Sequence, residues 1–152
     1  MSSLDAITIE QEPWPEFELG HNAEAILMEL TERQQHYLSH GESGAIDLRT
    51  LPLSIAEREK LRYILGHGEV TITLNSCGRS DIYETAIAGI WWLSHYNEEG
   101  ELLAEQLEVT PLPAIVATDR SEIALAQQLL RQRIKTELPQ AADEGVNDET
   151  DC

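Results

Sequence analysis

The sequence has few cysteines and no long apolar run, and each shortage excludes a class of protein. Only Cys77 and Cys152 occur, so no disulfide framework can be read. A cysteine-ligated iron–sulfur cluster within one chain is excluded as well, because Cys77 is the one cysteine inside the body. No stretch of about 18 apolar residues is present, and the N-terminus lacks a basic start followed by an apolar segment. We therefore expect a protein of the reducing cytoplasm, with no export signal and no membrane span.

Basic residues are also scarce: the chain has 10 Lys and Arg and 28 Asp and Glu, which gives a formal net charge of −18. Nucleic acids and anionic membranes are bound through clustered Lys and Arg, so both are disfavoured as partners, whereas basic partners would be attracted. Acidic residues gather at the two ends of the chain. We expect an acidic leader over residues 1–20, a single α+β domain over 21–138 and a disordered acidic tail over 139–152.

The spacing of apolar residues and the positions of turn residues predict three helices and the strands of an antiparallel sheet. Ser54 and Glu57 form a capping box, which starts a helix that Gly66 ends. Two further helices are expected over 22–39 and 119–138, the latter burying Ile123, Ala126, Leu130 and Ile134. The expected strands cover residues 45–49, 69–74, 81–96 and 101–109, the last three forming a meander. The order α-β-α-β-β-β-α predicts an α+β fold, with helices packed on one face of the sheet.

Histidines are the first candidates for chemistry. His36 and His40 lie four apart on a predicted helix, a spacing that can place two imidazoles on one metal, but a third ligand is not evident. His67 lies between Gly66 and Gly68, where it could reach a ligand or fill the space beside flexible backbone. No nucleophile with a nearby base and no phosphate-binding loop stands out. We expect a binding protein without catalytic residue, metal or cofactor.

The segment Ile82–Tyr96 carries the main candidates for partner binding. Glu84 lies in an apolar strand, where a carboxylate is costly unless it is paired or hydrogen-bonded. A structural role, accepting bonds from backbone amides, competes there with contact to a partner or substrate. Trp91 and Trp92 are adjacent in this strand and must point to opposite faces. One can join the core while the other faces outward as an anchor, unless helices cover both faces.

An ordered series of short motifs resembles the HupH/HyaF family of hydrogenase expression proteins. The series covers roughly residues 48–118 and consists of Leu65-Gly66-His67-Gly68-Glu69-Val70, Ile82-Tyr83-Glu84-Thr85, Gly89-Ile90-Trp91-Trp92, Leu107-Glu108-Val109 and Pro113. The resemblance implies a maturation chaperone of nickel–iron hydrogenases that binds the small subunit precursor before export, alongside a thioredoxin-like accessory protein. It establishes no catalytic residue. The acidic balance would favour the basic twin-arginine leader of that precursor, and a homo-oligomer is left open.

Together these observations predict a partner-binding surface on the sheet. Its predicted residues are Glu69, Glu84, Thr85, Gly89, Trp91, Trp92, Tyr96 and Glu108. The alternative is a metal-binding protein or small enzyme that uses His67 and Glu84.

Overall fold

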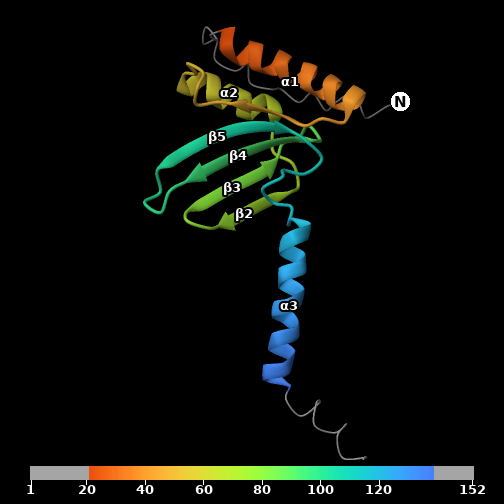
Figure 1. The fold of residues 1–152 in the computed structure, drawn as a ribbon. Helices are drawn as coiled ribbons and strands as arrows, with labels where there is room; N and C mark the ends of the chain where they lie inside the picture. The colour runs from red at the N-terminus through yellow and green to blue at the C-terminus, as the bar shows by residue number, and fades with distance from the viewer. Residues whose placement is uncertain (1–20, 139–152) are drawn as a thin grey trace, which may run out of the picture. The chain divides into compact units, whose positions relative to one another are not determined.

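The computed structural model describes residues 21–138, which divide into two compact units, 21–111 and 112–138. The first unit contains two helices and a five-stranded sheet, and the second contains one helix (Figure 1). The predicted acidic leader and acidic tail lie outside the described residues. Within residues 21–138, no helix is long and apolar enough to cross a membrane.

The first unit begins with helix α1 (His21–His40), whose buried residues Ala23, Ile26 and Leu30 recur on one face. Helix α2 (Ile55–Leu65) starts with the predicted capping box. The Ser54 hydroxyl accepts a hydrogen bond from the backbone N–H of Glu57 at 3.1 Å, and the Glu57 carboxylate accepts one from the N–H of Ser54 at 2.9 Å. These reciprocal bonds satisfy two donors that a helix start leaves free.

The sheet confirms the predicted α+β class. It is antiparallel throughout, with strand order β1-β5-β4-β3-β2. Its strands are β1 (Gly44–Asp47), β2 (Thr71–Asn75), β3 (Arg79–Glu84), β4 (Ile90–Tyr96) and β5 (Leu102–Val109). Helices α1 and α2 lie on one face of this sheet (Figure 1). The hydrophobic core between these helices and the sheet consists of Ala23, Ile26, Leu30, Ile46, Leu48, Leu61, Leu65, Ile90, Trp92, Leu107 and Val109.

One strand predicted over residues 81–96 is two strands in the structure. A turn between Thr85 and Gly89 separates β3 from β4, so the sheet has five strands rather than four. The Thr85 hydroxyl accepts a hydrogen bond from the N–H of Ile87 at 3.2 Å and donates one to its carbonyl oxygen at 3.0 Å. Gly89 has φ +82°, a conformation that side chains disfavour. These local bonds close a hairpin between β3 and β4. The residue types in this part of the chain also suit a continuous strand, which is why one strand was predicted.

The second unit contains helix α3 (Arg120–Glu137). Its start is capped by Glu122, whose carboxylate accepts a hydrogen bond from the N–H of Asp119 at 3.3 Å. No residue of this helix is buried, so the predicted burial of its apolar face is wrong. Among the described residues of this unit, 112–138, there is no second helix or strand to cover that face. The exposed apolar residues are Ile123, Leu125, Leu129, Leu130 and Ile134.

Candidate functional site

Two loops meet backbone to backbone at one end of the sheet. We call them the motif loops: residues 65–70 join α2 to β2, and residues 84–90 join β3 to β4. The N–H of Gly68 donates to the carbonyl oxygen of Glu84 at 2.7 Å. The N–H of Ala86 in turn donates to the carbonyl oxygen of a residue in the other loop, Leu65, at 2.9 Å. The two loops therefore form one hydrogen-bonded frame.

Glycines in the first motif loop are required by this close approach. A Cβ on Gly68 would lie 2.6 Å from the carbonyl oxygen of Thr85 and 2.9 Å from that of Glu84. Gly66 has φ +67°, and a Cβ there would lie 2.9 Å from the Cβ of Ala86. A side chain at either position would fit only if the backbone of the two loops moved.

Glu84 joins the frame to the end of β5 through the second motif loop. Its carboxylate oxygen Oε2 accepts a hydrogen bond from the N–H of Gly89 at 3.1 Å. The carbonyl oxygen of Gly89 accepts from the N–H of Thr110 at 2.9 Å, and the carbonyl oxygen of Thr110 accepts from Nε1 of Trp91, also at 2.9 Å. Glu84 therefore has the structural role of a carboxylate that holds a backbone amide.

The two tryptophans point to opposite faces of the sheet, as the alternation of a strand requires. Trp92 lies in the core beneath the helices and is 1% exposed, whereas Trp91 lies on the other face and is 3% exposed. Neither ring faces solvent, so the burial of both rings contradicts the alternative in which one tryptophan faces outward. The guanidinium of Arg62 lies 4.8 Å from the centre of the Trp92 ring.

His67 belongs to a stack of rings on the helix-covered face. Its ring lies parallel to that of Tyr83, with 4.2 Å between centroids and 11° between planes, and Tyr83 is followed by Trp92 at 6.3 Å. Its Nδ1 is 3.0 Å from the carbonyl oxygen of Gly68. Burial raises the pKa of Tyr83, and the nearby charge of Arg62 offsets part of this effect. His67 and Glu84 are thus engaged with different neighbours.

The other predicted metal candidates also have partners. His36 stacks on His40 at 4.4 Å, and its Nε2 lies 2.9 Å from a carboxylate oxygen of Glu42. Within residues 21–138, no group of three or more His, Cys, Asp or Glu side chains could hold a metal ion.

The remaining predicted residues are divided between the two ends of the sheet. Glu69 is exposed on the first motif loop. Glu108 lies opposite Trp91 on β5 and accepts a hydrogen bond from the amide of Gln106 at 2.6 Å. Tyr96 lies at the far end of β4, away from Ile90 and the motif loops.

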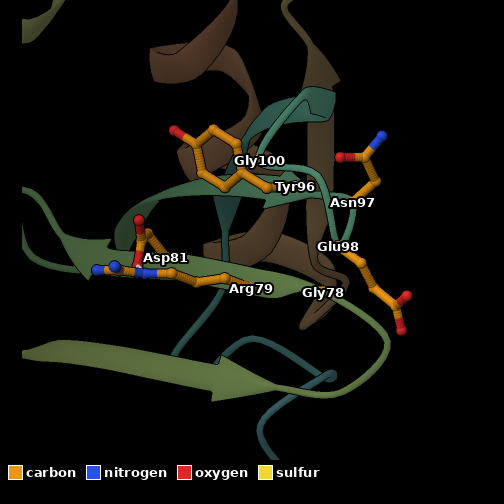
Figure 2. A pocket seen from close by; sticks show the side chains of 7 residues that line it. All are labelled: Gly78, Arg79, Asp81, Tyr96, Asn97, Glu98 and Gly100. Carbon is orange, nitrogen blue, oxygen red and sulfur yellow. Dashed lines mark hydrogen bonds and ion pairs between the residues drawn. The ribbon is translucent and has the colours of Figure 1, made fainter.

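A hollow of about 360 Å³, lined in part by Tyr96, lies at the hairpin end of the sheet (Figure 2). The side chains of Arg79 and Asp81 meet on one side of it, with Nε of the arginine 2.7 Å from Oδ1 of the aspartate. In Figure 2 the side chain of Glu98 extends away from the ring of Tyr96. The residues that line it are Gly78, Arg79, Asp81, Tyr96, Asn97, Glu98 and Gly100. Tyr96 is therefore not brought together with the other predicted site residues.

A cluster of charges around one buried carboxylate was not recognised in the sequence, and its two arginine side chains, Arg58 and Arg62, are 27% and 51% exposed. Glu105 on β5 is 2% exposed and pairs with Arg58, and its second oxygen lies 3.3 Å from the guanidinium of Arg62. Breaking a buried pair leaves an uncompensated charge, so such clusters normally serve the fold.

An apolar groove beside the motif loops was also missed. We call it the α1 groove. It measures about 420 Å³ and is lined by Gln34, Tyr37, Leu38, Ala88, Gly89, Val109, Thr110 and Pro111. Leu38, near the end of α1, is 79% exposed. Next to the groove, the second motif loop presents Ala86, Ile87 and Ala88, all exposed.

Comparison with known proteins matches most of the chain to one protein family. The conserved region described as HupH hydrogenase expression protein, C-terminal conserved region, matches residues 21–137. The hydrogenase expression/formation protein HupQ of Azotobacter chroococcum mcd 1 is 31% identical over 113 residues, which cover 73% of this chain and 40% of the relative. HupH of Rhodobacter capsulatus is 31% identical over 102 residues, which cover 67% of this chain and 37% of that protein. The chain thus spans about two fifths of the length of these relatives.

A solved structure has the same fold. The hydrogenase expression protein HupH from Thiobacillus denitrificans ATCC 25259 is 38% identical and superposes with a TM-score of 0.74. The match covers 77% of this chain and 98% of that chain.

Proposed function

The chain belongs to the family of the HupH hydrogenase expression protein, C-terminal conserved region, and we propose that it acts in hydrogenase maturation by binding another protein. The client is a hydrogenase small subunit precursor before export, with a thioredoxin-like accessory protein acting alongside. The observation that carries this proposal is the motif frame, which holds the exposed tip Ala86–Ala88 beside the α1 groove.

The tip and the groove have the chemistry of a protein contact. Ile87 is 42% exposed and Leu38 is 79% exposed, so both have apolar surface that a partner can cover. Burying a whole isoleucine side chain is worth roughly 1.5–3 kcal/mol, so the exposed part of Ile87 can contribute about 1 kcal/mol. The rigid frame beneath the tip lowers the entropy lost on binding.

Acidic side chains near the motif frame favour a basic client. Glu69 is exposed on the first motif loop, and Glu84 and Glu108 flank Trp91 on the sheet. With a net charge of −18 for the chain, a client with clustered arginines would be attracted at long range. We expect the affinity for the precursor to fall as ionic strength rises, because salt screens such attraction.

The test is binding of the purified chain to a small subunit precursor, measured by calorimetry at low and high salt. Ile87→Asp places a charge at the centre of the proposed contact and should weaken binding about tenfold or more. Ile55→Asp is the matched control, because Ile55 is 78% exposed at the other end of α2 and an acidic residue suits a helix start.

The two variants together decide the proposal. Binding lost in Ile87→Asp and retained in Ile55→Asp would support it. Equal affinities of both variants and the unmodified chain would refute the tip as the contact. No binding of the unmodified chain to the precursor at any salt concentration would refute this client.

A further inference from the structure

Strand β2 forms one edge of the sheet, and among residues 21–138 no strand pairs with its outer side. Just before β2 begins, the N–H of Glu84 donates to the carbonyl oxygen of Val70 at 2.9 Å. Just after β2 ends, the N–H of Ser76 donates to the carbonyl oxygen of Gly78 at 3.0 Å. In an antiparallel ladder, hydrogen-bonded and non-bonded pairs alternate. Even-numbered residues of β2 therefore bond to β3. The residues whose N–H and C=O point to the open edge are Thr71, Thr73 and Asn75.

This edge lacks the features that normally prevent pairing between sheets. Proteins protect edge strands with charged residues, prolines, bulges or short length. The segment Thr71–Asn75 contains no charged residue and no proline, and its pairing with β3 is regular. The opposite edge differs, since β1 has four residues, ends at Asp47 and packs against α1.

We propose that β2 pairs with β2 of a second copy of this chain, antiparallel about a two-fold axis at Thr73. Thr73 would then exchange two hydrogen bonds with Thr73 of the second copy, and Thr71 would exchange two with Asn75 of the second copy. The two five-stranded sheets would become one continuous sheet. This inference does not rest on the proposed function.

In this register the side chains of the two β2 strands are complementary. Ile72 and Leu74 are half-buried and share a face with the buried residues Ile82 and Leu93. In the pair, Ile72 lies next to Leu74 of the second copy, so each covers part of the other's exposed surface. On the other face Thr73 lies opposite Thr73 of the second copy, and Thr–Thr pairs across strands are favourable.

The uncharged strand favours a second copy over a client segment as its occupant. In a chain with 25% charged residues, an edge without charge avoids repulsion between identical strands. A basic client would instead gain from acidic side chains, which this strand does not offer. The contact between strands of five residues is small, so we expect a weak dimer.

The test is sedimentation equilibrium of the full chain over protein concentrations up to about 1 mM, the range in which weak association is detected. We expect a monomer–dimer equilibrium that strengthens with salt, because screening reduces the repulsion between two chains of charge −18. Thr73→Pro removes an N–H that points outward and so spares the bonds to β3. It should raise the dimer dissociation constant about tenfold or more, whereas Thr73→Val, which keeps the N–H, should leave it within about twofold.

A charge pair identifies the two-fold axis even if the proline variant folds poorly. Thr73→Lys and Thr73→Glu should each be monomeric, because the residue faces its own copy, and an equimolar mixture should form a dimer. Recovery of that mixed dimer supports pairing at β2. A monomeric unmodified chain, a dimer unaffected by these substitutions, or a mixture that stays monomeric would each overturn the proposal.

Discussion

Gly68 is the tightest point of the motif frame, and adding one carbon there tests it directly. A Cβ would lie 2.6 Å from the carbonyl oxygen of Thr85 and 2.9 Å from that of Glu84, and backbone atoms cannot rotate away. Overpacking of this kind costs about 1–3 kcal/mol. The hydrogen bond from Gly68 to Glu84 would also weaken, at a cost of about 1 kcal/mol. We expect Gly68→Ala to lower the free energy of unfolding by about 2–4 kcal/mol.

Gly41→Ala is the control for this substitution. Gly41 has φ +72°, and a Cβ there would meet nothing within 4 Å. Its cost is therefore conformational and amounts to about 1 kcal/mol. Urea unfolding of the full chain, followed by circular dichroism, measures both variants. If Gly68→Ala loses no more stability than Gly41→Ala, the close approach of the two loops is not as described.

Two further predictions concern neighbours of the frame. Thr85→Val removes the buried hydroxyl that bonds both backbone groups of Ile87, so urea unfolding should show a loss of about 1–3 kcal/mol. Thr85→Ser should restore most of it. The raised pKa of Tyr83 means that the folded chain keeps this proton above the ordinary value of 10.0. The stability that Tyr83 contributes is thus present below pH 10.0 and lost as the pH rises further. Tyr83→Phe should make unfolding less sensitive to alkaline pH in a urea series, and an unchanged pH dependence would contradict this.

Local signals predicted the helices of the first unit well. The capping box of Ser54 and Glu57 requires only residues three apart, and the structure contains both of its bonds. The buried face of α1 also follows a short repeat, with Ala23, Ile26 and Leu30 at helical spacing. Such features depend on neighbours in the chain, so the sequence suffices to predict them.

The hairpin between β3 and β4 was missed because its turn consists of residues that also suit a strand. Thr85 and Ile87 have high β propensity, and only Gly89 indicated a break in the pattern. The α1 groove was missed for another reason. It depends on the meeting of Leu38 with Ala88 and Val109, which lie far apart in the sequence. No periodic pattern reports such a contact.

The motif residues have structural roles that differ from the contact role proposed for the tip and the groove. Gly66 and Gly68 permit the approach of the two loops, Glu84 holds an amide, and Trp91 is buried with its N–H bonded to Thr110. These positions therefore specify the frame. The exposed tip 86–88 and the α1 groove lie mainly outside the motif. It follows that the motif residues build the scaffold, and under the proposed function the residues that this scaffold presents would determine the partner.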